Sequence, residues 1–296
     1  MSPTPTGNDR FNAEAAAWDS NPDVHRASDG ALQAILAAHP SIRATKASGN
    51  TETEGLDILE IGCGTGLLSL RMAPYVRSIL AIDAAVGMID ALKSKLEDMQ
   101  GEEGETARRV VTPLCVLLED PEDPRLPAAS SGVNGDGDGD GDGDGDGDGD
   151  GDGDGDGDGE ASNIKRRKKF DLVTSHLVLH HIPDLKPLLH TMYGCLKPGG
   201  QVALTDFEDF GPEARKFHPE AKMLGVERHG IKADWLAGLM REVGLEDVDV
   251  SPAWTMEKEV ERFPGEWGHK RPEGGDGVEL EMMGFPFLLC RGTRKA

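Results

Sequence analysis

The sequence predicts an α/β fold, a doubly wound and mainly parallel sheet with helices on both faces. Two observations carry this prediction. Short apolar runs alternate with stretches of helical spacing, and the first runs end in acidic residues, the earliest of them followed by a glycine loop. In such sheets ligands bind beyond the carboxyl ends of the strands. We therefore expect the binding site where these acidic residues and the glycine loop meet.

The first strand and its loop lie in residues 56–70, which read LDILEIGCGTGLLSL. The run passes through Glu60 to glycines at 62, 64 and 66 and then takes a helical pattern. Glycine has no side chain and adopts positive φ freely, so a ligand can lie directly against this backbone. A dinucleotide fingerprint, G-x-G-x-x-G, requires a third glycine where this chain has Leu67. A structural turn or a nicotinamide site stays open at this point.

The pattern E-x-G-x-G-x-G at residues 60–66 resembles motif I of the class I S-adenosylmethionine-dependent methyltransferases, which have a Rossmann-like fold. That cofactor carries an ammonium, a carboxylate and a sulfonium but no phosphate. Glu60 can attract it where it would repel a pyrophosphate. The resemblance implies that the loop, including Gly62, Cys63, Gly64 and Gly66, binds this cofactor. For Cys63 we favour packing in a crowded loop over a role as nucleophile.

A second strand is predicted at residues 77–83, RSILAID. Its final residue, Asp83, lies 21 positions after Gly62, and a carboxylate at that distance can accept hydrogen bonds from ribose hydroxyls. The alternative is that Asp83 caps the helix at residues 84–93. We favour the ribose role, and the resemblance adds Ala84 and Met88 to the cofactor site.

A third strand is predicted at residues 110–118, which are rich in β-branched side chains. Pro113 indicates an irregular start or an edge strand. Glu119 and Asp120 follow the run. In the resembling family an acidic residue here reaches the adenine amino group, and we prefer Asp120 to Glu119 or Asp123. The alternative is a solvated acidic loop.

The fourth and fifth strands are predicted at residues 170–175 and 196–207. The fifth begins with the turn Lys197-Pro-Gly-Gly, a second family mark, in which proline fixes φ and the glycines allow positive φ after a helix. Helices are predicted at 185–195 and 233–243, and last strands at 245–250 and 284–290. The resemblance implies seven strands with a reversed final pair, and a cofactor contact at Ser175 and His176.

Methyl transfer from a sulfonium is an in-line displacement, so the protein chiefly orients the acceptor. A general base typically adds about 10²- to 10⁴-fold. His176, His180 and His181 follow the fourth strand, and any one of them can serve as the base. We prefer His181 and His180, although a histidine here can also order the turn. Family members that methylate adenine or glutamine amino groups usually carry N-P-P-Y or D-P-P-Y where this chain has residues 175–178, SHLV. A small-molecule acceptor is therefore the preferred prediction.

Three segments are candidates for covering the substrate. Residues 11–36 resemble the N-terminal helices of small-molecule methyltransferases, including those of ubiquinone and menaquinone biosynthesis. Phe11 and Trp18 share one helix face there, as a lid over the cofactor or as an anchor. Residues 208–230 form a second candidate, with Phe210 and His229 as the predicted substrate contacts. It also contains Phe217, His218, Met223 and Gly230. Residues 251–283, with Trp254, read as a surface excursion.

The domain organisation follows from length and composition. A chain of 296 residues suits one α/β domain, so we predict lid helices at 1–55 and a methyltransferase domain at 56–296, interrupted by a disordered acidic loop at 128–169. No run of about 18 apolar residues and no hydrophobic leader occur, which predicts a cytoplasmic protein. The four scattered cysteines predict neither zinc nor disulfides.

Residues 135–159 are a strict Gly-Asp alternation that has no apolar group to bury. Its 12 aspartates account for the difference between a formal charge of −23 and one of −11. Such acidity disfavours nucleic acid and anionic membrane as partners. The register does not fit a calcium-binding EF-hand, because Gly149 stands where the first aspartate belongs. The basic residues that follow the tract lead into the amino end of the fourth strand, so we expect the loop to leave the sheet on the side away from the chemistry.

The basic run KRRKK at residues 165–169 follows the acidic tract. It allows a nuclear-import or nucleic-acid patch, but we favour attraction to the neighbouring aspartates. The sequence as a whole predicts an S-adenosylmethionine-dependent methyltransferase that acts on an O, C or N atom of a small-molecule metabolite. An NAD(P)-dependent oxidoreductase and a protein-directed or noncatalytic member of the methyltransferase fold are the alternatives.

Overall fold

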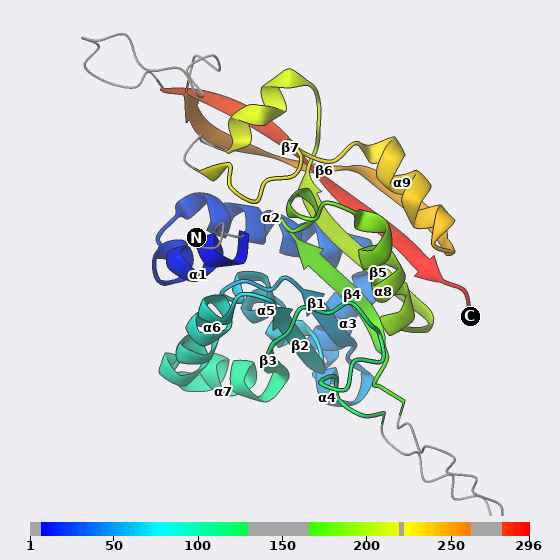
Figure 1. Ribbon diagram of the computed structural model, residues 1–296. Coiled ribbons are helices and arrows are strands. Elements are labelled where there is room, and N and C mark those ends of the chain that lie inside the picture. Colours follow the sequence, from blue (N-terminus) through cyan, green and yellow to red (C-terminus); the bar gives the residue numbers. More distant parts are fainter. Residues whose placement is uncertain (1–6, 130–165, 219–221, 262–279) are drawn as a thin grey trace, which may run out of the picture.

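The computed structural model describes residues 7–129, 166–218, 222–261 and 280–296. Its seven-stranded sheet has the order β3-β2-β1-β4-β5-β7-β6 (Figure 1). The first five strands are parallel: β1 (Asp57–Ile61), β2 (Ser78–Asp83), β3 (Val111–Cys115), β4 (Phe170–His176) and β5 (Leu196–Phe207). The last two, β6 (Leu245–Glu261) and β7 (Leu280–Arg294), are antiparallel. The predicted mainly parallel sheet with a reversed final pair is confirmed.

Helices cover both faces of this sheet, as predicted (Figure 1). On one face α8 (Leu185–Cys195) and α9 (Ala233–Glu242) contribute Leu189 and Met240 to a buried cluster. On the other, α2 (Pro22–Ala38), α5 (Leu67–Met72), α6 (Val86–Asp98) and α7 (Gly101–Val110) bury their apolar stripes, among them Ile35 and Leu92. The remaining helices are α1 (Gly7–Trp18), α3 (Pro40–Ser48) and α4 (Thr51–Glu54), with short 3₁₀ turns η1 (Ala73–Tyr75), η2 (Leu179–His181) and η3 (Pro212–Phe217).

Two strand ends differ from the prediction. Strand β3 lies at the sheet edge, as Pro113 indicated, but it stops at Cys115. The Val116 amide makes one more bond, to the Asp83 carbonyl of β2, and residues 117–118 then leave the sheet. Strands β6 and β7 continue far past their predicted ends as a long ribbon. Trp254 belongs to this ribbon and stacks on Phe287 at 4.7 Å between ring centroids. The described parts of residues 251–283 are therefore sheet, and not the surface excursion that we predicted.

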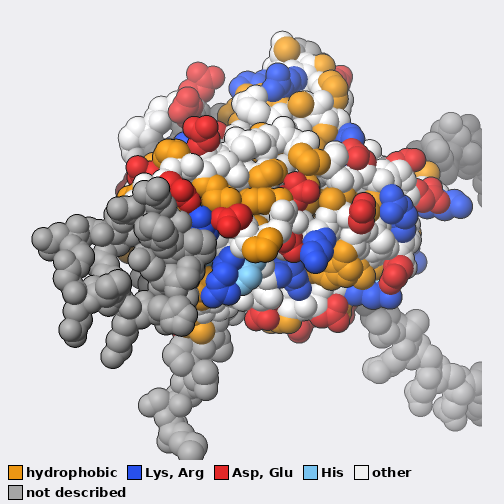
Figure 2. Space-filling view, turned by 90° about the horizontal axis from the view of Figure 1, so that it is seen from above, with side chains coloured by type: hydrophobic (Ala, Val, Ile, Leu, Met, Phe, Trp, Pro, Cys, Tyr) orange, Lys and Arg blue, Asp and Glu red, His pale blue; other side chains and the backbone are white. Residues whose placement is uncertain are grey.

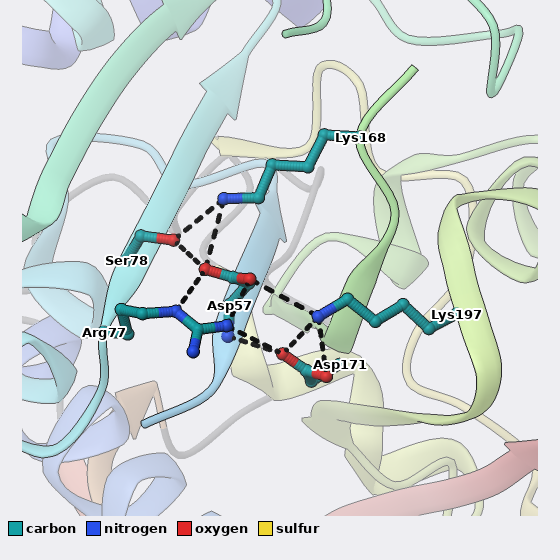
Figure 3. A network of polar contacts seen from close by, with 6 residues as sticks. All are labelled: Asp57, Arg77, Ser78, Lys168, Asp171 and Lys197. Carbon is teal, nitrogen blue, oxygen red and sulfur yellow. Dashed lines mark hydrogen bonds and ion pairs between the residues drawn. The ribbon is translucent and has the colours of Figure 1, made fainter. Parts of the chain in front are cut away.

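A polar network ties the amino ends of four parallel strands together (Figure 3). Buried Asp57 at the start of β1 receives hydrogen bonds from Arg77 and Ser78 and ion pairs with Lys168. Lys197 of the predicted K-P-G-G turn bonds Asp171 at 2.9 Å and lies 3.4 Å from Asp57. The lysine of this family mark thus has a structural role, on the edge of the sheet opposite to the expected site.

Most of the predicted loop at 128–169 lies outside the described residues, including the whole Gly-Asp tract. Its described ends pair with each other through a bridge between Ala128 and Arg167. Lys168 bonds Asp57 at 3.1 Å, and Lys169 ion-pairs with Glu122. These two lysines of the basic run therefore pair with carboxylates of the folded domain, at the amino ends of the strands.

The surface mixes both signs of charge on the face seen from above, where hydrophobic side chains lie between Lys or Arg and Asp or Glu side chains (Figure 2). Within the described residues, each helix is too short or too polar to cross a membrane. All four cysteines are free, and three of them are buried.

Candidate functional site

A cavity of about 260 Å³ lies at the carboxyl ends of β1, β2 and β4. Its walls come from the glycine loop, from the turn after β4, from α1 and α2, and from β6. This is where ligands bind in open α/β sheets. The cavity brings together twelve of the predicted site residues: Phe11, Trp18, Glu60, Gly62, Cys63, Gly64, Asp83, Ala84, Met88, His176, His180 and His181.

Each glycine of the loop has its own reason to lack a side chain. Gly62 has φ +74°, and a Cβ there would lie 2.3 Å from Val178 Cγ2 in the turn after β4. Gly64 has φ +54° and open space at the Cβ position, so its backbone is bare. A Cβ on Gly66 would lie 2.3 Å from Leu92, which means that this glycine lets α5 pack on α6. Gly66, assigned to the cofactor by the sequence, is outside the cavity lining.

Asp83 holds the glycine loop in place. One carboxylate oxygen accepts the Gly64 amide at 2.8 Å and the other accepts the Ala85 amide at 2.8 Å. Burial raises the pKa of this carboxyl. The second bond orders the start of α6, as in the capping alternative, while the side chain also lines the cavity. Both readings of Asp83 are thus compatible with its position, and the ribose contact stays a prediction.

Glu60 is a buried carboxyl group in the cavity wall, with 2% of its surface exposed. Its pKa is raised to about 7, mainly by burial and to a smaller extent by the nearby Asp83 charge. The hydrogen bond that Glu60 accepts from the Ser69 hydroxyl opposes this rise. A carboxylate in this position is stabilised by a cation that enters the cavity. The electrostatics therefore favour a ligand with a positively charged group.

Cys63 is a packing residue in the cavity wall. Its thiol donates only a weak hydrogen bond to the Gly64 carbonyl, at 3.5 Å. Burial, followed by the charge of Glu60, raises the pKa of the thiol well above its usual value. The neutral thiol is a poor nucleophile.

The predicted adenine contacts lie outside the cavity. Asp120 accepts the Glu122 amide at 2.8 Å within a turn, and the Glu119 carbonyl accepts the Thr191 hydroxyl. Because β3 ends at Cys115, the apolar residues Val116, Leu117 and Leu118 reach the cavity in place of the acidic pair. This end of the cavity offers a flat ring apolar contact, and the structure does not bring Glu119 or Asp120 to it.

The end of β4 divides into a structural residue and a cavity residue. The buried Ser175 hydroxyl donates to the Ile61 carbonyl at 2.8 Å, joining β4 to β1, and is not part of the lining. His176 does line the cavity, with Nδ1 2.8 Å from the Thr205 hydroxyl. Burial lowers its pKa to about 4, so the ring is neutral at physiological pH. Of these two adjacent residues, Ser175 thus joins two strands and His176 faces the cavity.

Three histidines meet at the far side of the cavity. His180 and His181, from η2, are joined by His218, which follows η3. Their nearest ring nitrogens lie within 4.8 Å of one another. His180 Nδ1 contacts both oxygens of the buried Asp206 carboxylate, at 2.8 and 3.0 Å. The sequence placed His218 in the second lid segment but did not predict that it meets His180 and His181. It missed Asp206, although this residue, like Glu60 and Asp83, is an acidic residue near the carboxyl end of a strand.

Helix α1 closes the cavity and is anchored at several points. The Phe11 ring packs edge-on against His181 at 5.1 Å and lies 5.9 Å from Trp18. Arg10 donates hydrogen bonds to the carbonyls of Lys222 and Leu224, in the segment that follows η3. Lid and anchor are therefore one arrangement, because the residues that cover the cavity also fasten the helix.

Two predicted substrate contacts lie elsewhere. Phe210 is 39% exposed and packs against Phe285, while His229 Nε2 lies 3.2 Å from Arg215. Neither side chain lines the cavity. In their place, Phe217 of η3 and two residues of β6 line the cavity. The β6 residues, Met256 and Lys258, reach it because the ribbon is longer than predicted.

Comparisons with known proteins give the family. A model described as "Methyltransferase domain" matches residues 29–250, three quarters of the chain. The chain belongs to this methyltransferase family. An uncharacterized methyltransferase of Schizosaccharomyces pombe is 25% identical over 248 residues, covering 81% of this chain and 72% of the relative. The ubiquinone biosynthesis O-methyltransferase of Xanthomonas axonopodis is 25% identical over 251 residues, 82% and 81% of the two chains.

A solved structure agrees with this methyltransferase fold. A Thermotoga maritima S-adenosylmethionine-dependent methyltransferase, described as a possible histamine N-methyltransferase, has a TM-score of 0.50 at 17% identity and covers 96% of this chain and 98% of its own. The resemblance drawn from the glycine loop and the K-P-G-G turn is confirmed. The oxidoreductase alternative is accordingly set aside.

Proposed function

We propose that this methyltransferase transfers the methyl group of S-adenosylmethionine to a hydroxyl of an apolar small molecule bound in the cavity beneath α1. The observation that carries the proposal is the continuity of that cavity. It runs from Glu60, Gly64 and Asp83 to the three histidines. One continuous cavity thus borders both the residues expected to hold the donor and those expected to hold the acceptor.

The cofactor fits the residues at the sheet end of the cavity. Its ammonium suits the Glu60 carboxyl, whose pKa burial raises to about 7, because a cation nearby stabilises the ionised form. Its ribose suits Asp83, and its adenine suits the apolar stretch at Leu117. The bare backbone at Gly64 lets the nucleoside approach closely.

The acceptor end of the cavity is lined by apolar side chains and a histidine ring. Phe11, Phe217 and Met256 supply apolar contact, while His181 supplies a ring nitrogen. A hydroxyl on a largely apolar molecule matches this combination. The relative named as a ubiquinone biosynthesis O-methyltransferase supports the same class of acceptor.

The enclosure chiefly positions the acceptor for in-line attack on the sulfonium methyl, an effect worth on the order of 7 to 11 kcal/mol. We propose that the acceptor hydroxyl lies beside the candidate bases His180 and His181. The Gly225 carbonyl lies 2.6 Å from His181 Nδ1, which leaves Nε2 as the nitrogen for a ligand. Burial lowers the pKa of His181 to about 3, so by itself this ring is a weak proton acceptor.

The test is transfer of labelled methyl from S-adenosylmethionine into a small-molecule extract and, separately, into a protein fraction. We expect label in the small molecules only, and label confined to protein would favour a protein-directed enzyme. Calorimetry with S-adenosylmethionine and NADH accompanies it. Asp83→Asn should weaken S-adenosylmethionine binding at least tenfold, while Asp90→Asn on the exposed face of α6 should not. NADH binding in place of S-adenosylmethionine would overturn the proposal.

A further inference from the structure

We propose that His180, His181 and His218 bind one divalent transition metal ion, Zn²⁺ being the best match, at the acceptor end of the cavity. The site rests on the proposed function only for its catalytic role, because metal binding is measurable without cofactor. It departs from the sequence prediction of no zinc. That prediction considered cysteine spacing, whereas η3 brings His218 to the other two rings from 37 positions away.

The donor set is the first argument. Three imidazoles offer one nitrogen each within 4.8 Å of one another. Three histidines with an open fourth position are a typical catalytic zinc site. Bonds of about 2.0–2.1 Å place tetrahedral ligand nitrogens about 3.4 Å apart, so inward ring movements of roughly an ångström complete the site. No hydrogen bond to His218 Nδ1 opposes this movement among the described residues.

The partner of His180 is the second argument. Asp206 is fully buried and contacts Nδ1 of His180, and its carboxylate also accepts the His180 and Phe207 backbone amides. Metal-binding histidines commonly donate the second ring N–H to a carboxylate, which fixes the tautomer and raises ligand basicity. His180 is only 1% exposed, and its other nitrogen, Nε2, is buried without a hydrogen-bond partner in the described part of the chain. Such a nitrogen lacks the bond that a buried polar atom normally has.

His181 completes the pattern with the Gly225 carbonyl in place of a carboxylate. The 2.6 Å contact at Nδ1 leaves Nε2 as the ligand atom. Burial lowers the pKa of His181 and of His218, and neutral imidazole is the form that binds metals. Arg10 and Lys258 place positive charge near the three histidines. The carboxylates of Asp206 and of Glu14, which lines the same cavity, offset this charge.

A metal ion in this position can promote ionisation of the acceptor hydroxyl. His181 alone is too weak a base to remove that proton effectively. Binding to a metal lowers the pKa of a hydroxyl toward neutrality. The proton passes to solvent, the oxygen lone pair forms the O–CH₃ bond, and the S–CH₃ bond breaks with its electron pair left on sulfur. Charge and atoms balance without a further reactant.

The experiment is a titration of the chelator-treated full chain with Co²⁺ and with Zn²⁺, in the absence of S-adenosylmethionine. We expect one equivalent to bind, with the intense visible absorption of tetrahedral Co²⁺. His218→Ala should weaken binding at least 100-fold, whereas His190→Ala, at an exposed position of α8, should leave it unchanged. Equal binding by wild type, His218→Ala and His190→Ala would show adventitious metal only and would overturn the proposal.

Asp206→Asn is the second variant, and it reads out a positioning role. We expect about a 10- to 100-fold loss of Co²⁺ affinity with unchanged far-ultraviolet circular dichroism. If His218→Ala does not fold, His181→Gln takes its place in the titration. Calorimetry with S-adenosylmethionine on the same protein separates the two proposals. Cofactor binding without specific Co²⁺ binding refutes the metal site alone, and Co²⁺ binding without cofactor binding refutes the proposed function alone.

Discussion

Glu60→Gln tests the electrostatics of the cavity wall. The substitution keeps the shape of the side chain and its acceptor for the Ser69 hydroxyl, but it removes the ionisable group. Burial raises the pKa of Glu60 from 4.5 to about 7, which means that the folded protein binds this proton more tightly than the unfolded chain does. Its contribution to the free energy of unfolding therefore falls as pH rises through that window.

The magnitude follows from the shift. Each pKa unit corresponds to about 1.36 kcal/mol, so ionising Glu60 in the cofactor-free protein costs up to about 3 kcal/mol at pH 8 and less than about 1 kcal/mol at pH 5. The neutral amide of the variant carries no such cost. In urea unfolding without cofactor we expect the variant to be more stable than wild type at pH 8, with a difference that shrinks toward pH 5. A variant equally or less stable than wild type at pH 8 refutes the buried-carboxyl reasoning.

The same substitution should have the opposite effect on cofactor binding. Loss of a charge-assisted contact to the ammonium predicts about 10- to 100-fold weaker S-adenosylmethionine binding by calorimetry. Methylthioadenosine, which lacks the amino-acid end, is the matched control, and both proteins should bind it alike. Equal affinity of both proteins for S-adenosylmethionine would contradict the placement of the ammonium at Glu60.

Three further predictions concern the rest of the molecule. Asp57→Asn leaves the cations of its network around a neutral amide, so we expect the free energy of unfolding in urea to fall by about 2–3 kcal/mol at pH 7. The difference from wild type should narrow as pH falls below about 4, because hydrogen bonds from Arg77 and Ser78 stabilise the ionised form of Asp57. A decrease no larger than that caused by exposed Asp90→Asn would count against this reasoning. Arg10→Ala removes the bonds that fasten α1, and should raise KM for the acceptor severalfold, whereas Phe210→Ala, outside the cavity, should leave it unchanged. Deleting residues 131–163, between the paired ends of the acidic segment, should leave cofactor affinity within twofold, and a tenfold loss would show that this segment contributes to the site.

The parts of the fold fixed by local physics were predictable from sequence. Helix α8 has its predicted bounds, since Asp184 caps it and its apolar spacing is regular. The glycine loop and Asp83 were found because strand-end carboxylates and bare backbone have strong local signatures. The end of β3 was not, because the apolar run continues to Leu118 while pairing with β2 stops at Cys115.

Residues that meet only through tertiary structure were missed or misplaced. His218 belongs to the predicted second lid segment, but it follows a short 3₁₀ turn with no sequence signature, and its meeting with His180 was not predicted because only folding brings the two together. Phe210 looked like a pocket residue because it follows a strand end, yet it packs on Phe285 of the ribbon. The length of that ribbon depends on pairing between β6 and β7, a long-range contact that their separate patterns did not specify.

The most direct test of the central claim is a crystal structure of the chain with S-adenosylhomocysteine. We predict ribose hydroxyls at Asp83, the amino-acid end beside Glu60, and the sulfur facing the side of the cavity that holds His181. A cavity left empty at saturating ligand, or a nucleoside bound away from Gly64, would contradict the account.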